Sequence, residues 1–264
     1  MNYSEVLSIS KGPAVCYSGY RSGQVPGVSY PSYEQVKEDL LIVKQHWTYI
    51  RLYSCDNHSK TVLEVIEKEQ LDLKVMLGAY IIAEENNPNC PWGGGVYSKQ
   101  ELEQNKVNNQ IEINKLIEFA NKYTSIVFTL SVGNEACVEW TDHMVPVAKV
   151  IAYVNQLKEA TKQPVTFCEN YVPWLDKLAP LVEAVDFISI HTYPLWEYKT
   201  IDEAIAFTKT NYEAVAERYP NKLVVITEAG WASTSNGQGI PREHANPVFQ
   251  KFTTKNSAVG VRRK

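Results

Sequence analysis

The sequence contains no long apolar run. No stretch approaches the roughly 20 apolar residues that a helix needs to cross a bilayer, although 44% of the 264 residues are hydrophobic. The first residues, MNYSEVLSIS, also lack the basic segment followed by an apolar segment that marks a secretory signal. We therefore expect a globular chain with a sizeable buried core and no membrane span.

An excess of one charge is also missing. The chain has 26 Lys and Arg against 30 Asp and Glu, which leaves a net charge of -4. Such a small negative charge produces no field that would attract a polyanion. Nucleic acids and anionic membrane surfaces are therefore poor candidates as partners, and a neutral or small ligand is favoured.

Motifs that hold metals or phosphates are absent as well. The sequence has no HExxH, no P-loop and no CxxC, and no GxGxxG follows its first predicted strand. We expect neither a metal site nor a cofactor. The five cysteines are odd in number and show no disulfide-framework spacing, so we expect buried free thiols. They are Cys16, Cys55, Cys90, Cys137 and Cys168.

What the sequence does contain is an alternation of strand and helix patterns. Short apolar, β-rich runs lie at residues 13–17, 49–53, 73–80, 126–132, 164–169, 187–193 and 223–228. Apolar residues recur with helical spacing at 32–46, 60–70, 99–123, 144–162 and 200–219. Strands that are apolar on both faces and alternate with helices predict a parallel α/β sheet. So many consecutive units favour a (β/α)8 barrel, as a single domain over residues 1–264, over a doubly wound sheet.

The carboxyl-terminal end does not complete this pattern. After a helical stretch near 241–252, only SAVGV, residues 257–261, resembles a final strand, and it is followed by Arg262, Arg263 and Lys264. We treat 253–264 as an atypical tail. We therefore expect a barrel in which the eighth strand and the last helix are missing or unusual, with free edges on the first and seventh strands.

Two glutamates end predicted strands on opposite sides of such a barrel. Glu135 follows the fourth strand in the run TLSVGNEACVEW, and Glu228 ends the seventh strand in VVITEAGW. Function in these barrels collects at the carboxyl ends of the strands. A single glutamate there is usually a loop residue or a helix cap, but two facing carboxylates suit glycoside hydrolysis. One carboxyl group gives a proton to the leaving oxygen, and the other attacks or activates water.

Other strand-end residues support a sugar site. Arg51 is the only cation among them, so it can hold Glu228 ionised, unless it forms a structural salt bridge elsewhere. We expect Tyr193 to orient Glu228 through its hydroxyl. His191 is interpreted more readily as a core or supporting histidine than as a catalyst, because isolated histidines are usually not catalytic.

Aromatic residues in the predicted loops suggest several sugar subsites. Flat indoles stack on the apolar faces of pyranose rings. Five tryptophans lie in predicted loops or just past strand ends, whereas Trp47 lies at the other face. Trp231, three residues after Glu228, is the strongest candidate for such stacking. The five are Trp92, Trp140, Trp174, Trp196 and Trp231.

The segments AVCYSGY, IRLY, SVGNE, ISIHTYP and VVITEAGW, in this order, resemble glycoside hydrolase family 17, within a clan of retaining barrel glycosidases. The likeness covers roughly residues 13 to 250. It favours the bacterial laminarinase-like branch over the plant enzymes, which typically show SESGWPS where this chain has TEAGWAS. No segment resembles the FDEPWK motif with which the family ends its last strand.

The resemblance implies roles for individual residues. Glu135 would be the general acid and then the base, and Glu228 the nucleophile that forms a glycosyl-enzyme. Asn134 would hydrogen-bond the sugar 2-hydroxyl, and Tyr17 would line the subsite of the attacked sugar. The remaining residues expected to bind substrate are Arg51, Tyr53, Tyr193, Trp231, Trp140 and Trp196.

These observations favour a retaining endo-β-1,3-glucanase acting on laminarin-type glucan, with a β-glucan oligo- or polysaccharide as its partner. Two alternatives remain open: a β-1,3-glucan transglycosylase that uses the same two glutamates, and a glucan-binding barrel impaired by the missing strand. We expect a monomer. Because a polysaccharide does not enter cells, we expect an extracellular or periplasmic protein of a bacterium, although this chain carries no signal.

Overall fold

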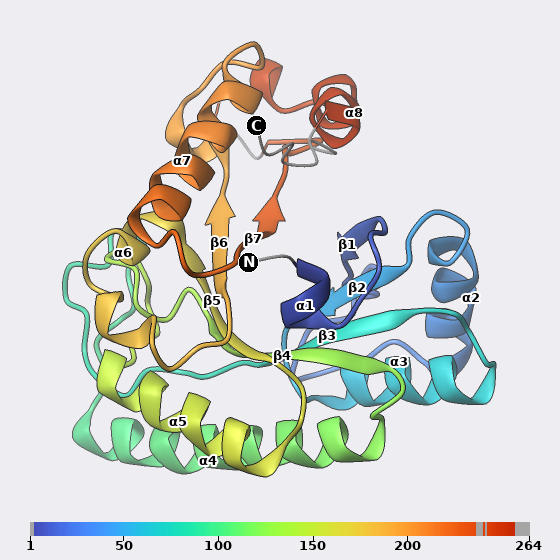
Figure 1. Cartoon of the computed structure of the whole chain (residues 1–264), viewed down its shortest axis with the longest axis horizontal. Coiled ribbons are helices and arrows are strands. Elements are labelled where there is room, and N and C mark those ends of the chain that lie inside the picture. Colours follow the sequence, from blue (N-terminus) through green and yellow to red (C-terminus); the bar gives the residue numbers. More distant parts are fainter. Residues whose placement is uncertain (1–2, 236–239, 241, 257–264) are drawn as a thin grey trace.

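The computed structural model describes residues 3–235, 240 and 242–256. It contains a 7-stranded parallel sheet in which the strands follow one another in chain order, from β1 to β7. The sheet curves into a nearly closed barrel (Figure 1). The strands are β1 (Ala14–Cys16), β2 (Tyr49–Leu52), β3 (Lys74–Ala79), β4 (Val127–Asn134), β5 (Val165–Asn170), β6 (Ile188–Thr192) and β7 (Val224–Ala229).

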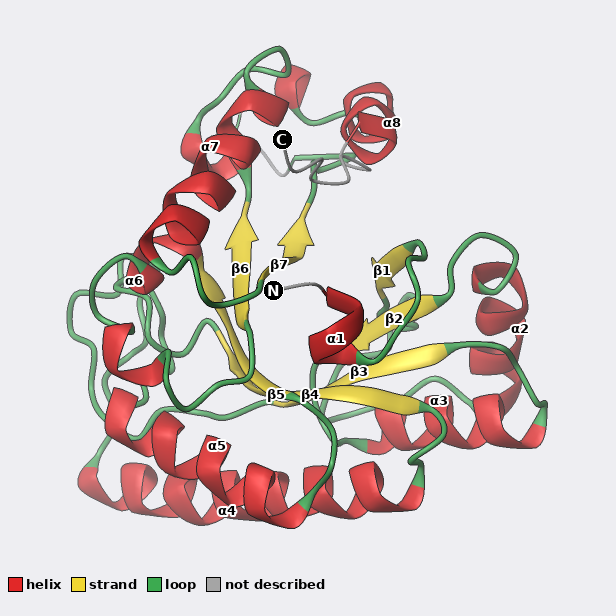
Figure 2. Ribbon diagram, in the orientation of Figure 1, coloured by secondary structure: helices red, strands yellow, loops and turns green. Residues whose placement is uncertain are grey.

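The predicted strands and long helices are all present. The helices are α1 (Tyr3–Leu7), α2 (Tyr33–Val43), α3 (Asn57–Lys68), α4 (Lys99–Lys122), α5 (Val147–Ala160), α6 (Tyr171–Trp174), α7 (Ala204–Arg218) and α8 (Pro247–Asn256), with 3-10 turns η1 (Ala179–Leu181), η2 (Pro194–Glu197) and η3 (Arg242–His244). The long helices cover the outside of the curved sheet (Figure 2). The prediction of a (β/α) barrel is therefore confirmed, and the part of the chain that the structure describes contains no eighth strand.

Local sequence signals fix where the long helices begin. Ser32 and Gln35 form a reciprocal capping box at the start of α2, and Ser98 and Glu101 form the same box at the start of α4. Such boxes satisfy two backbone N–H groups that a helix otherwise leaves unpaired. None of the helices in the described residues is long and apolar enough to cross a membrane.

Helix α1 packs against the inner side of the curved sheet. Leu7 joins Met76, Cys168 and Phe187 in a small apolar cluster on the inner side of the sheet. A larger cluster lies between the outer face of the sheet and the helices. The inner cluster leaves the carboxyl ends of the strands as the region where polar side chains gather.

The barrel is not closed by backbone pairing between its first and last strands. Among the described residues, β1 pairs only with β2, and β7 pairs only with β6. Figure 2 shows these edge strands facing each other without a strand between them. Side chains cross the opening instead: the Cys16 thiol donates to the Thr227 carbonyl oxygen at 3.3 Å, and Arg51 of β2 also reaches β7. The candidate final strand, 257–261, lies outside the described residues.

The cysteine prediction holds for four of the five thiols. All five cysteines are free, and four are buried. Cys16 is exposed, in contrast to the expectation. Cys16 ends the edge strand β1, and among the described residues this strand pairs only with β2, so no strand covers its other side.

Candidate active site

The turn after β4 brings Glu135 out of the sheet. Gly133 has φ 74° and Glu135 has φ 49°, so both residues adopt the left-handed conformation. Only glycine fits at position 133, because an added Cβ would lie 2.9 Å from Ile81 and 3.0 Å from Phe167. The Glu135 N–H donates to the Cys168 carbonyl oxygen at 2.9 Å, which ties the turn to β5. This geometry ends the strand and leaves the Glu135 side chain 28% exposed.

Glu228 is enclosed on several sides at the end of β7. Its Oε1 atom accepts from Arg51 Nη1 at 2.5 Å, and its Oε2 atom accepts from the Tyr193 hydroxyl at 2.6 Å. The side chain is only 10% exposed. The predicted partners of Glu228, Arg51 and Tyr193, are therefore both in place, and Arg51 does not form its salt bridge elsewhere.

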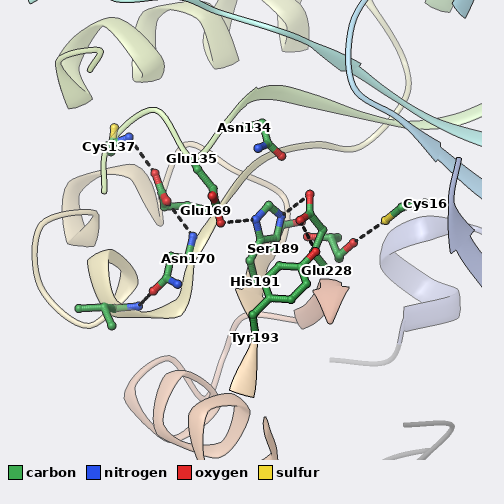
Figure 3. A network of polar contacts seen from close by, with 12 residues as sticks. Cys16, Asn134, Glu135, Cys137, Glu169, Asn170, Ser189, His191, Tyr193 and Glu228 are labelled. Atoms are coloured by element: carbon green, nitrogen blue, oxygen red, sulfur yellow. Dashed lines mark hydrogen bonds and ion pairs between the residues drawn. The ribbon is translucent and has the colours of Figure 1, made fainter. Parts of the chain in front are cut away.

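His191 lies between the two glutamates (Figure 3). Its Nδ1 atom is 2.9 Å from Glu135 Oε1, and its Nε2 atom is 3.5 Å from Glu228 Oε1. Arg51 Nη1 is 3.1 Å from the same Nε2 atom. A protonated ring would donate to both carboxylates, whereas a neutral ring would accept from Arg51 and still donate to Glu135. The sequence interpretation as a core or supporting residue missed this bridging position.

The charges at the site favour an ionised Glu228. Burial opposes ionisation, but the charges of His191 and Arg51 and the hydrogen bonds from Tyr193 and Arg51 outweigh it, so the pKa of Glu228 is lowered. Burial likewise opposes a charged His191. Hydrogen bonds with Cys168 and Glu135, together with the charge of Glu228, nevertheless raise the pKa of His191 to about 9.

Arg51 connects the two ends of the site. It is buried, and its Nη2 atom donates to Asn134 Oδ1 at 2.7 Å. Its guanidinium group also lies over the Tyr53 ring, 4.5 Å from the ring centre. A single planar fork thus fixes Asn134, on the Glu135 side, and Glu228. Three residues expected from the sequence, Arg51, Tyr53 and Asn134, are brought together here.

Tyr17 lies elsewhere. Its hydroxyl donates to Asp39 Oδ2 at 2.8 Å on α2, and its ring packs 5.4 Å from the His58 ring on α3. Tyr17 belongs to the large outer cluster and not to the barrel mouth. The expectation that it lines the sugar subsite is not supported by this position. Its neighbour Cys16 lies at the mouth instead, through the contact with Thr227.

The tryptophans fall into two groups. Trp92 and Trp196 are 79% and 59% exposed, and Trp140 is half-buried in the loop after β4. These three keep an accessible surface on which a sugar could stack. Trp174 is fully buried and donates to the Ser189 carbonyl oxygen at 2.9 Å, so its interpretation as a sugar platform is wrong.

Trp231 has a covered ring in this structure. It is 4% exposed, donates to the His244 carbonyl oxygen at 2.6 Å and meets the Phe249 ring edge-on. The indole therefore packs against the segment that leads into α8. In this position it supports the region around Glu228 from the side and offers little surface to a ligand.

Metal binding finds no support in the part of the chain that the structure describes. No three His, Cys, Asp or Glu side chains converge there in an arrangement that could hold a metal ion.

Residues 14–261 match the family model of the BtgE/BtgC glycoside hydrolase domain. The chain belongs to this family. No curated protein matches the sequence. The BtgE/BtgC assignment makes the chain a glycoside hydrolase domain, and the two glutamates at the barrel mouth are its best candidates for the catalytic pair.

Solved structures agree with this fold. An endo-laminarinase from Formosa Hel1_33_131 has a TM-score of 0.75 and 24% identity, and the match covers 97% of this chain and 78% of that one. An active-site mutant of a Rhizomucor miehei β-1,3-glucanosyltransferase, in complex with laminaritriose, has a TM-score of 0.68 and 20% identity, with 91% and 79% covered. A Bacteroides uniformis β-glucuronidase has a TM-score of 0.60 and 16% identity, with 90% and 27% covered. At these identities the likeness establishes the barrel fold.

In this glycoside hydrolase domain, the carboxyl groups of Glu228 and Glu135 have different surroundings. Glu228 is buried and held by cations and a hydroxyl, whereas Glu135 is more exposed and accepts one side-chain hydrogen bond, from His191. A buried, ionised carboxylate is suited to attack, and a more exposed one is suited to exchange protons with water.

Proposed function

We propose that the domain is a retaining endo-β-1,3-glucanase of the family 17 type. The observation that carries this proposal is the pair of glutamates in unlike environments on either side of His191. Retaining glycosidases require one carboxylate that attacks and one that first gives and then takes a proton. Glu228 suits the first role, and Glu135 suits the second.

In the proposed reaction, a Glu228 oxygen attacks the anomeric carbon while Glu135 gives its proton to the departing glycosidic oxygen. Glu135 then takes a proton from water, which attacks the anomeric carbon and releases Glu228. Arg51 and Tyr193 keep Glu228 ionised and oriented. Asn134, held by Arg51 at 2.7 Å, is placed to meet a hydroxyl of the sugar next to the nucleophile.

Support for a β-1,3-glucan as the substrate comes from the similar structures. One is an endo-laminarinase, and another holds laminaritriose. Exposed aromatic rings at Trp92 and Trp196, with half-buried Trp140, add stacking surfaces suited to a chain of sugars. We further propose that the protein acts outside the cytoplasm, because its substrate is a polymer, and that it acts as a monomer.

The test is the release of reducing ends from laminarin by the protein and by Glu228→Ala. Cleavage by the parent and its loss in the variant are the expected results. Proton NMR of the first products should show the β-anomer, because two displacements retain configuration. If both proteins bind laminarin and neither cleaves it, the domain is a glucan-binding barrel impaired by its incomplete closure.

A transglycosylase is the second candidate, because two of the similar structures are β-1,3-glucanosyltransferases. It would use the same glutamates and deliver the sugar to a second glucan in place of water. Mass spectrometry of products from laminaripentaose separates the two activities. If most products are longer than the starting oligosaccharide, the main activity is glycosyl transfer and not hydrolysis.

A further inference from the structure

A third glutamate, Glu169, lies beside Glu135. It belongs to β5, next to the strand that carries Glu135, and is fully buried. Figure 3 shows its side chain next to that of Glu135, on the side away from His191. The reaction as proposed above gives this carboxyl group no part.

Glu169 holds the backbone around Glu135 and the end of its own strand. Its Oε2 atom accepts from the Cys137 N–H at 2.8 Å, and its Oε1 atom accepts from the Asn170 N–H at 2.7 Å. Cys137 lies two residues after Glu135, at the end of the turn that begins with Gly133. Both carboxylate oxygens are therefore used to fix backbone, and neither points to solvent.

The same turn is held from its other side by a lysine. Lys177 Nζ donates to the Cys137 carbonyl oxygen at 2.8 Å. Cys137 is thus fixed through both its N–H and its C=O. This support matters because the Glu135 conformation, with φ 49°, is one that a non-glycine residue rarely adopts.

The charge on Glu169 is coupled to the charge on Glu135. Burial, followed by the negative charge of Glu135, raises the pKa of Glu169 to about 8, although the N–H groups of Cys137 and Asn170 and the charge of His191 lower it. The Cys137 thiol and Lys177 are the other titratable groups close to this carboxyl. Glu169 therefore lies close enough to Glu135 for the Glu135 charge to act on it.

We propose that Glu169 is a positioning residue for the reaction. Its buried carboxyl group fixes the turn that carries Glu135 and so sets the position from which Glu135 gives and takes its proton. This inference rests on the proposed role of Glu135 as acid and base. It predicts that loss of the Glu169 carboxyl group damages the proton-transfer step more than it damages the nucleophilic step.

The test compares two substrates with different needs for an acid. Laminarin requires a proton on its leaving oxygen, whereas 2,4-dinitrophenyl β-laminaribioside has a leaving group that departs without one. For Glu169→Gln we expect kcat/KM on laminarin to fall about 10- to 100-fold and kcat/KM on the dinitrophenyl substrate to stay within about threefold. The reason is that glutamine has one acceptor oxygen, so it keeps at most one of the two backbone bonds that Glu169 makes with the N–H groups of Cys137 and Asn170.

Glu112→Gln is the matched control. Glu112, on α4, also accepts two backbone N–H bonds, from Cys55 at 2.6 Å and Tyr80 at 3.3 Å, but these bonds fix the segments after β2 and β3 and not the turn that carries Glu135. Any loss in this variant should be equal on the two substrates. Glu169→Asp, which keeps the carboxyl group on a shorter side chain, should lose less activity on laminarin than Glu169→Gln.

Equal losses on both substrates for Glu169→Gln would overturn the inference. If Glu169→Gln does not fold, as judged by its thermal melting, Glu169→Asp carries the test: its loss must be larger on laminarin than on the dinitrophenyl substrate. Glu135→Ala separates this inference from the proposed function. If Glu135→Ala itself keeps full activity on laminarin, the proposed function fails; if only Glu169→Gln does, the inference alone fails.

Discussion

The ends of β4 and β7 hold their glutamates by different means. β4 is an inner strand, with β3 and β5 on its two sides, and the turn after it is fixed by backbone bonds. Among the described residues, β7 is an edge strand that pairs only with β6, and Glu228 depends on side chains from β2 and from the end of β6. An inner strand can therefore maintain a strained turn, whereas an edge strand needs partners that reach across the barrel.

The largest expected effect is the loss of activity when either glutamate is replaced, and the products then distinguish the roles of Glu228 and Glu135. Glu228→Ala should lower laminarin hydrolysis by about 10⁴-fold or more, because the attacking group is lost. Azide can replace the missing carboxylate in each variant when an activated glycoside is supplied. Glu228→Ala should then give the α-glycosyl azide and Glu135→Ala the β-glycosyl azide, as identified by NMR. The same anomer from both variants would contradict the assigned roles.

The second effect concerns the side-chain support of Glu228. Arg51→Met should lower kcat/KM on laminarin by about 10²- to 10³-fold, because it removes the charged donor to Glu228 and the partner of Asn134. Loss of this positive charge raises the pKa of Glu228, so the acid limb of the rate profile should move to higher pH.

Arg51→Lys is the control for this effect. Lysine keeps the charge but cannot form the planar fork to Glu228 and Asn134. The acid limb should therefore move less than in Arg51→Met, while part of the activity is still lost. An acid limb that stays in place in both variants would show that Arg51 does not govern the ionisation of Glu228.

The sequence predicted the strands and the two glutamates because both depend on local patterns. Side-chain direction was harder to predict. Side chains of neighbouring residues in a strand point to opposite faces of the sheet. Because the Cys16 side chain lies at the barrel mouth, the Tyr17 side chain points to the helix side. The same rule could have found His191, which lies two residues before Tyr193 and shares its face.

Other parts of the site were not predictable from local patterns. The burial of Trp231 and Trp174 depends on loops and helices that pack over them. Glu169 ends a strand just as Glu135 does, yet it is fully buried and binds backbone. Whether a strand-end carboxyl faces the solvent or a neighbouring turn depends on tertiary packing, which residue spacing does not reveal.

The third effect compares the glycines near the two glutamates. Gly133→Ala should lower the free energy of unfolding by about 2 to 4 kcal/mol, since alanine must adopt a positive φ and overlap with Ile81 and Phe167. At Gly230 an added Cβ meets only Tyr193, at 3.6 Å, which is an ordinary contact. Gly230→Ala should therefore cost less than about 1 kcal/mol. Urea denaturation measures both, and equal losses would remove the proposed contrast between the β4 and β7 ends.

The smallest effect is the pH dependence that His191 contributes to the free energy of unfolding. His191 contacts both Glu135, after β4, and Glu228, on β7. Its pKa is about 9 in the folded protein, above the usual 6.5. A raised pKa gives stability that is fully present below the unfolded value and is lost as the pH rises through the folded one. The difference in unfolding free energy between the protein and His191→Gln should thus shrink by about 1 to 3 kcal/mol from pH about 6 to about 9.5. Subtraction of the variant cancels the titration of distant lysines and tyrosines. A constant difference over this range would mean that the ring stays neutral, accepts from Arg51 and donates only to Glu135, so that Arg51 and Tyr193 alone hold Glu228.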